Sequence, residues 1–283
     1  MNVASLTPAT TQHPTSGKVY FIADAHLGSE TGPTEHRKLT DLLDLLTHLE
    51  GRASGLFLLG DIFDFWFEYP GVEPTDHPEV LSALMRLSEA GTDIHFLGGN
   101  HDYWAGSKLE MLTGARVHCQ PVEVTLFTER LFIAHGDGLP TGDLGYRLLK
   151  AILRNRLAIA AFGLIPRTVG RAVARWASGL SEVNEERILR AIPPMKAFLA
   201  GVVTRGCDAA VVAHVHRPAL WRWEKGTGVI VGDWMANRSV VELGENGFRM
   251  LKWSDGALID NERAAVPPAV GEGEDGASTP PHP

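Results

Sequence analysis

KVYFIADAH, residues 18–26, is the stretch of this sequence that most restricts the fold. It is a short apolar run of the kind that forms a buried β-strand, and it leads directly to Asp24 and His26. Four more blocks carry polar side chains of the same kind: GLFLLGD (55–61), IHFLGGNHD (94–102), LFIAHGD (131–137) and DAAVVAHVH (208–216). Ligands gather outside the carboxyl ends of strands in open α/β sheets, so we expect these blocks to converge on one site.

The segments around these blocks alternate between strand and helix patterns. Short apolar runs predict buried strands at 18–23, 55–59, 93–97 and 131–134, and apolar residues at i, i+3, i+4 and i+7 predict helices at 34–49 and 78–90. Closely spaced strands follow, as in antiparallel hairpins, at 208–213, 219–223, 229–232, 239–243 and 248–253. This order predicts an α/β protein with helices packed outside its sheets.

Length and composition exclude several classes of protein. The 283 residues are 44% hydrophobic, enough for one large core or two small ones, and the formal net charge is −8. An acidic chain without a basic tail is not expected to bind nucleic acid, because that binding relies on cations that contact phosphates. Two cysteines cannot form a disulfide framework, and residues 1–17 lack the features of a signal peptide. The longest apolar run, 157–165, is too short to span a membrane, so we expect a cytoplasmic protein.

Both ends of the chain have the composition of disordered tails. Residues 1–16 are rich in Thr and Pro, and residues 256–283 contain many Pro, Gly and acidic residues, above all from 262 onward. Between them we expect one domain, 17–255, with a helical insertion at about 143–200. Within this insertion, residues 144–181 contain no acidic residue but seven basic ones, beside the apolar stretch LAIAAFGLIP. An ordinary helical hairpin with solvated arginines is the alternative to a cap that binds a ligand.

The candidate ligands within the five polar blocks are two carboxylates, one amide and four imidazoles. This mixture suits borderline divalent metals better than it suits Ca²⁺ or Mg²⁺. In Asp-x-His and His-x-His, alternate side chains of an extended segment lie on one face, so both can reach one cluster. A carboxylate such as Asp61 can bridge two metals with its two oxygens. Each block alone is common, but the ordered series predicts a metal centre.

The series D-x-H, GD, GNH, HGD and H-x-H resembles the calcineurin-like metallophosphoesterases over roughly residues 18–255. The resemblance implies a four-layered αββα sandwich of two mixed sheets, a helical cap insertion and two divalent metal ions. The family suggests Mn²⁺, and the ligand types also suit Fe, Zn and Co. The implied ligands are Asp24, His26 and His216 for one ion and Asn100, His135 and His214 for the other, with Asp61 bridging. Asp61 and His101 are the implied catalytic residues, and His101 would assist the leaving group or steady the phosphoryl oxygens.

Longer motifs resemble one branch of that family, the UDP-2,3-diacylglucosamine diphosphatases. These motifs are GDIFDFWFEY (60–69), GNHDYW (99–104), FIAHGDGLPTGDLGYRLLK (132–150), HVHRPA (214–219) and VGDW (231–234). Enzymes of this branch cleave the diphosphate of a UDP-linked, doubly acylated glucosamine in lipid A synthesis, giving lipid X and UMP. The resemblance therefore implies a lipid-linked UDP-sugar substrate and peripheral association with the cytoplasmic face of the inner membrane. The basic, apolar insertion would cover the acyl chains.

The resemblance also implies a set of substrate-contacting residues: Asn100, His101, Asp143, Asn184, Arg187 and His214. The chain departs from the branch at three places. His101 stands where its best-known members have Arg, Ala213 replaces a usual Gly, and the cap positions that contact substrate have no clean match, with Asn184 and Arg187 as the nearest candidates. Asp143 is alternatively the N-cap of the first helix of the insertion.

Other interpretations of the sequence stay open. Asp64 and Asp102 are expected as caps or turn formers, and the aromatic run at 63–69 as strand or core packing or as part of a substrate pocket. A metallophosphoesterase of the same fold acting on another nucleotide or phosphoester is the second functional candidate. A non-catalytic scaffold is the third, which the complete ligand set disfavours.

Overall fold

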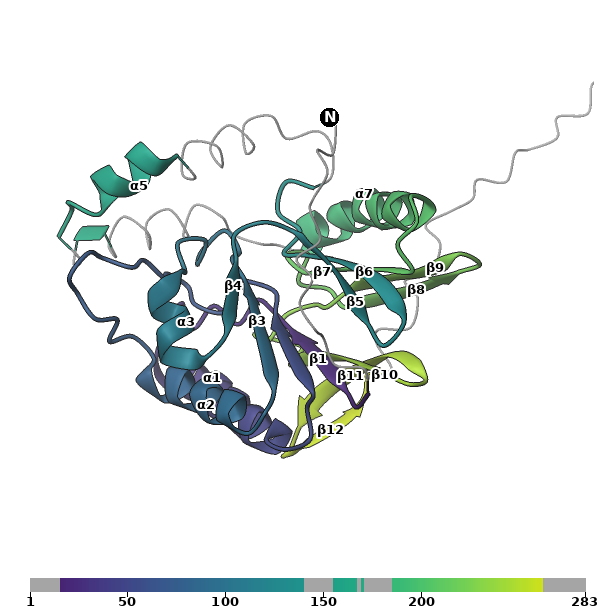
Figure 1. Cartoon of the computed structure of the whole chain (residues 1–283), viewed down its shortest axis with the longest axis horizontal. Coiled ribbons are helices and arrows are strands. Elements are labelled where there is room, and N and C mark those ends of the chain that lie inside the picture. Colours follow the sequence, from purple (N-terminus) through teal and green to yellow (C-terminus); the bar gives the residue numbers. More distant parts are fainter. Residues whose placement is uncertain (1–15, 140–154, 167–168, 171–184, 262–283) are drawn as a thin grey trace, which may run out of the picture.

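The computed structural model describes residues 16–139, 155–166, 169–170 and 185–261 (Figure 1). The elements in these ranges are β1 (Val19–Ile22), α1 (Gly32–Leu49), β2 (Gly55–Leu58), α2 (Pro78–Glu89), β3 (Asp93–Leu97), α3 (Ser107–Thr113), β4 (Arg116–His118), β5 (Val122–Leu126), β6 (Glu129–Ala134), α5 (Arg156–Phe162), α7 (Glu185–Thr204), β7 (Ala209–Val212), β8 (Ala219–Trp223), β9 (Gly226–Ile230), β10 (Ser239–Gly244), β11 (Gly247–Ser254) and β12 (Ala257–Asp260). Within this described part, the helices are all too short or too polar to cross a membrane.

Two mixed β-sheets form the centre of the molecule. The first has the order β12-β11-β10-β1-β2-β3-β4 and the second β5-β6-β7-β9-β8. Strands β1 to β4 run parallel to one another, and so do β6, β7 and β9, whereas β8–β9 and β10–β11 are the expected antiparallel hairpins. The parallel arrangement places the carboxyl ends of β1, β2 and β3 along one edge of the first sheet, next to those of β6 and β7.

Helices cover the outer faces of both sheets. Helices α1, α2 and α3 pack on the first sheet, and α7 packs on the second, as Figure 1 shows. Alternation along β1 explains this layering, because Tyr20 and Ile22 face the helices while Val19 and Phe21 face the second sheet. The order helix, sheet, sheet, helix is the four-layered sandwich that the family resemblance implied.

The structure corrects one expected domain boundary and one possible strand. Residues 257–260, which we expected in the C-terminal tail, form β12 and pair with β11. This edge strand is mostly exposed and therefore gives almost no hydrophobic signal. The aromatic run at 63–69 is not a strand, because its β-pairing is limited to isolated bridges at Phe63 and Phe67. The tail segments 1–15 and 262–283 lie outside the described residues, as do Asp143 and Asn184.

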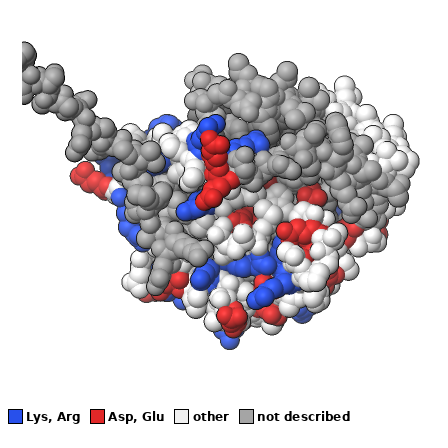
Figure 2. Space-filling model, turned by 180° about the vertical axis from the view of Figure 1, so that it is seen from behind, with Lys and Arg blue, Asp and Glu red and all other residues white. Residues whose placement is uncertain are grey.

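Charged side chains are interspersed on the molecular surface. On the face shown in Figure 2, the described Lys and Arg side chains lie among Asp and Glu side chains of the same face. Ion pairs between described surface residues include Arg249 with Asp260 at 2.9 Å and Arg130 with Glu123 at 2.6 Å. Exposed pairs of this kind contribute little to stability, so the buried layers carry most of it.

Candidate metal centre

Loops at the carboxyl ends of five strands deliver the seven expected ligands. Asp24 and His26 follow β1, Asp61 follows β2, and Asn100 follows β3; His135 follows β6, and His214 and His216 follow β7. Hydrogen bonds join these loops across the two sheets. The His26 N–H donates to the Asp61 carbonyl at 2.9 Å, and the Asp24 carboxylate accepts the His214 N–H at 3.0 Å. All seven residues therefore lie around one point, as the sequence predicted.

The backbone at this point is unusual. Five of the seven residues have left-handed φ angles between 42° and 69°, a region that non-glycine residues seldom occupy: Asp24, His26, Asp61, His214 and His216. Each such residue costs on the order of 1–3 kcal/mol and persists only where its surroundings enforce the conformation. Gly99 shows how tightly the loops approach, since a Cβ there would lie 2.2 Å from Asp61 Oδ1. The chain thus accepts local strain to direct these side chains inward.

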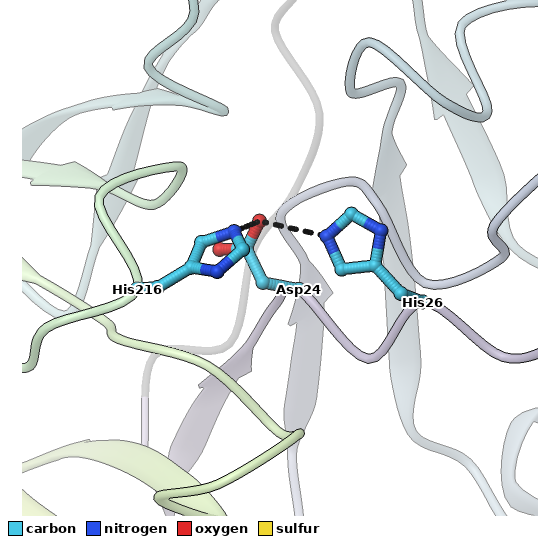
Figure 3. A group of neighbouring side chains, drawn as sticks. All are labelled: Asp24, His26 and His216. Atoms are coloured by element: carbon cyan, nitrogen blue, oxygen red, sulfur yellow. Dashed lines mark ion pairs between the residues drawn. The ribbon is translucent and has the colours of Figure 1, made fainter. Parts of the chain in front are cut away.

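Asp24 is the centre of one group of ligands. Figure 3 shows His26 and His216 on either side of it, each directing a ring nitrogen toward the same carboxylate oxygen. The Nε2 atom of His216 is 3.4 Å from Asp24 Oδ1, and that of His26 is 3.9 Å away. These three side chains offer ligand atoms within 4.8 Å of one another, which is close enough to share one ion.

Asp61 lies between this group and a second one. Its Oδ2 atom is 3.8 Å from His26 Nε2 and 3.3 Å from His135 Nε2. Asn100 Oδ1 lies 3.3 Å from the same His135 nitrogen, and His214 completes a set with Asp61 and His135 within 4.8 Å. The Asp61 carboxylate thus lies between the two groups of side chains.

Two orphaned atoms test whether a cation fits here. Among the described residues, Asp24 Oδ1 and His26 Nε2 are buried and make no hydrogen bond. Buried polar atoms nearly always have a partner, and an unpaired carboxylate oxygen facing imidazole nitrogens is the environment that a divalent metal satisfies. Nitrogen and oxygen ligands of these types suit Mn, Fe, Co and Zn. The residues therefore fit a divalent metal ion.

Electrostatic coupling lowers the pKa of some of these groups and raises the pKa of others. Burial alone would raise the pKa of Asp61, but the neighbouring His135, His26 and His101 hold that pKa well below its usual range. Burial lowers the pKa of His135, yet Asp61 outweighs it and raises that pKa to about 10. For His214, burial and the nearby His135 lower the pKa to about 4, so its imidazole is neutral at pH 7. Protons and metal ions therefore compete for the same carboxylate–imidazole pair.

His101 stands beside the ligands with its own carboxylate. Its Nδ1 lies 2.9 Å from the Asp64 carbonyl oxygen and 3.5 Å from Asp64 Oδ1, and its ring meets the His26 ring edge-on. Burial lowers the pKa of His101, but hydrogen bonding to Asp64 and the charge of Asp61 raise it to about 9. In the metal-free protein His101 is thus a cation at neutral pH, suited to an anionic group. From the sequence we expected Asp64 only as a cap or turn former, and this role was missed. Its position three residues after Asp61 could have indicated it.

Asp102 fixes the loops that carry Asp61 and Asn100. Its fully buried carboxylate accepts the N–H groups of Asp61 at 3.0 Å, Ile62 at 2.8 Å and Gly99 at 2.8 Å. This exceeds the turn-forming role expected from the sequence, because it ties two separate strand ends together.

A cavity of about 650 Å³ opens in front of the centre. Its floor includes His26, Asn100, His101 and His214, which contains three of the expected substrate contacts. The loop from Gly28 to Thr31 forms one part of its wall, and the start of α7, where Arg187 lies, forms another. Arg187 is thus placed at the cavity, whereas Asp143 and Asn184 lie outside the described residues.

Aromatic side chains connect α5 to the core near this cavity. Phe162 of α5 stacks on Trp104 with ring centroids 5.5 Å apart, and it lies 5.0 Å from Phe67. Phe63 and Trp66, from the same run of sequence as Phe67, point into the core instead. The aromatic run thus has two faces, one that packs in the core and one that receives the helix.

Comparison with known proteins gives a consistent result. The sequence model of the family described as "Calcineurin-like phosphoesterase" matches residues 17–218. A UDP-2,3-diacylglucosamine hydrolase of Pseudomonas fluorescens is 31% identical to the chain, covering 82% of it and 94% of that protein. One of Nitrosococcus oceani is 27% identical over 85% of this chain and 96% of its own. One of Porphyromonas gingivalis is 37% identical over 58% of this chain and 60% of its own.

Proposed function

The chain belongs to the calcineurin-like phosphoesterase family and is a metal-dependent hydrolase, and from this premise we propose that it cleaves the diphosphate of UDP-2,3-diacylglucosamine to lipid X and UMP. The observation that carries the proposal is the similarity to hydrolases of that name over more than four-fifths of the chain. The site chemistry supports it, because the cavity joins carboxylates, imidazoles and a cationic His101.

Two divalent ions, which we propose to be Mn²⁺, would supply Lewis acidity and an activated water to this reaction. Asp24, His26 and His216 would hold one ion, and Asn100, His135 and His214 the other. Asp61 would contact both, in agreement with its place between the two groups.

His101 is the proposed general acid. Its imidazolium, paired with Asp64, would donate a hydrogen bond to a phosphoryl oxygen or a proton to the leaving group. Arg187, across the cavity, would attract the diphosphate. Asp143 and Asn184 remain proposed substrate contacts.

We propose that the acyl chains lie against the cap and that the enzyme works at the cytoplasmic face of the inner membrane. Leu157 and Leu164, on and just after α5, have 80% and 86% of their surface exposed. Exposed leucines next to arginines are typical of segments that enter the surface of an anionic bilayer. A soluble substrate would give no reason for them.

A second candidate is a phosphoesterase of the same fold that acts on another nucleotide or phosphoester. The observation in its favour is His101, which stands where the best-known members of the lipid A branch have Arg.

One assay separates the two candidates. Mn²⁺-dependent release of UMP from UDP-2,3-diacylglucosamine should be measured beside UDP-N-acetylglucosamine and bis-p-nitrophenyl phosphate, with Asp61→Asn as the inactive control. Strong preference for the diacylated substrate supports the proposal. Cleavage of bis-p-nitrophenyl phosphate alone would support phosphoesterase activity and contradict the proposed lipid substrate.

A further inference from the structure

Lys38 of α1 is a fully buried lysine whose ammonium group lies behind the cavity wall. Its Nζ donates to the carbonyl oxygen of His26 at 2.8 Å and lies 3.2 Å from Ser29 Oγ. Removing a cation from water is far more costly than removing a neutral group, so a lysine persists in such a place only with good partners. Both of these partners belong to the loop that follows β1.

Glu35, three residues before Lys38 on α1, supplies the opposite charge. Its carboxylate lies 2.8 Å from Lys38 Nζ and accepts the backbone N–H groups of Gly28 at 2.7 Å and Glu30 at 3.2 Å. The ion pair therefore binds donors and acceptors of the loop together. Charge-assisted hydrogen bonds of this kind are stronger than neutral ones, and here four of them act on residues 26–30.

This loop serves the metal centre on one side and the cavity on the other. The His26 ring points toward Asp24 and Asp61, from a backbone with a φ of 42°. The residues from Gly28 to Thr31 form one cavity wall. The His26 carbonyl also accepts the Ser29 hydroxyl at 2.7 Å, so its orientation is fixed by donors from both α1 and the loop.

We propose that Lys38 and Glu35 are positioning residues that hold His26 in the orientation that binds metal. The inference rests on the proposed metal centre, in which His26 shares one ion with Asp24 and His216. Among the described residues, Lys38 Nζ contacts the His26 carbonyl oxygen, Ser29 Oγ and the Glu35 carboxylate, with Glu30 Oε2 at 4.0 Å, so it acts on the metal through the path of the loop. Besides the shared Asp61, the ligands of the other ion follow β3, β6 and β7, and Lys38 and Glu35 make no hydrogen bond to any of these ligands in the described structure.

Lys38→Met in the full chain tests this, since it keeps the length of the side chain and removes its charge. Mn²⁺ binding would be measured by isothermal titration calorimetry, with metal content per chain as a second readout. We expect one of two binding events to weaken at least tenfold while the other keeps its affinity. Lys18→Met is the matched control, because Lys18 pairs with Glu242 at 2.9 Å at the opposite end of β1, and both events should persist.

Glu35→Gln is the second variant, and it decides the question if Lys38→Met does not fold. It keeps one carbonyl acceptor for the loop, and we expect it to weaken the same binding event. Unchanged affinities in either folded variant, or an equal loss at both events, would overturn the positioning role. A wild-type chain that binds no Mn²⁺ would instead overturn the metal centre, which separates the two failures.

Discussion

At the scale of the residue, His101 is the proposed group that acts in catalysis without binding metal. Its Nδ1 is engaged by Asp64, and the seven proposed ligands are complete without it. We expect His101→Gln to lower kcat roughly 10²- to 10⁴-fold, the usual contribution of a general acid, with the metal content per chain unchanged. Asp64→Asn should act in the same direction, and the double variant should lose little more than His101→Gln alone. Loss of metal from His101→Gln would show that His101 is a ligand.

The pair of His135 and Asp61 predicts that the stability of the metal-free protein falls as the pH rises above neutral. Burial lowers the pKa of His135, but Asp61 raises it to about 10 from an ordinary 6.5. A raised histidine pKa stabilises the fold fully below about pH 6.5, and this stabilisation is lost as the pH rises toward 10. His101, with its pKa raised to about 9, adds to this direction. The Tm in EDTA should therefore fall between pH 6.5 and 8.5.

Saturating Mn²⁺ should reverse that slope. Metal ligation requires neutral imidazoles, so metal binding strengthens as protons leave. Melting curves at the two pH values, with EDTA and with Mn²⁺, measure both slopes. In EDTA, the Tm of His135→Gln should change less with pH than the Tm of the wild type. Parallel slopes in EDTA and Mn²⁺ would contradict the competition between proton and metal.

The convergence of the seven proposed ligands could be predicted from the sequence, because each follows an apolar run or a Gly-containing turn at a strand end. The roles of Asp64 and Lys38 could not, because no local pattern connects Asp64 to His101 or Lys38 to the loop after β1. Lys38 is buried on the same helix as Leu42 and Leu45, and one of its acceptors is a backbone carbonyl twelve residues earlier. A pattern of side chains carries no information about carbonyl groups.

At the scale of the element, α5 contacts the aromatic run and Trp104 through the ring of Phe162. Phe162 contacts Phe67, Trp104 and Phe65, whereas Leu157 at its start is 80% exposed. We expect Phe162→Ala to increase hydrogen exchange in α5 and to raise KM for the diacylated substrate at least fivefold. The rate on bis-p-nitrophenyl phosphate should stay unchanged, because the metal centre is separate from this contact.

Met111→Ala on α3 is the control for this change, since Met111 is 75% exposed and lies outside the aromatic contacts described for α5. Equal KM values for Phe162→Ala and wild type would mean that the position of α5 does not affect binding of the lipid.

Elements with strong internal periodicity were predictable, and those defined by their neighbours were not. The pattern at 34–49 gave α1 within two residues, because buried leucines recur on one face. Strand β4 has three half-buried residues and exists because β3 offers it an edge. The aromatic run was ambiguous because Phe63 and Trp66 pack inward while Phe67 turns toward α5. Tertiary contacts decide such segments.

At the scale of the whole molecule, the metal centre lies where the two sheets meet. Each proposed ion takes ligands from both: Asp24 and His26 follow a strand of the first sheet and His216 one of the second, and the other ion is shared in the same way. Without an ion, the same contact holds a buried carboxylate oxygen with no hydrogen bond among the described residues and several strained backbones. Metal binding should therefore stabilise the sandwich as a unit.

Removal of the metal tests this directly. A ligand at about 1,000 times its Kd adds roughly 4 kcal/mol to the free energy of unfolding, which corresponds to a rise in Tm of roughly 8 °C or more. We expect Mn²⁺ to raise the Tm of EDTA-treated protein by that order, in one cooperative transition, because both sheets contribute ligands. Asp61→Asn should abolish most of the rise in Tm, since this carboxylate lies between the two ligand groups. Glu123→Gln, which removes an acidic side chain on β5, should keep the rise. Two separate transitions in the metal-free protein would show instead that each sheet with its helices is stable alone, and that the ions join two units already folded.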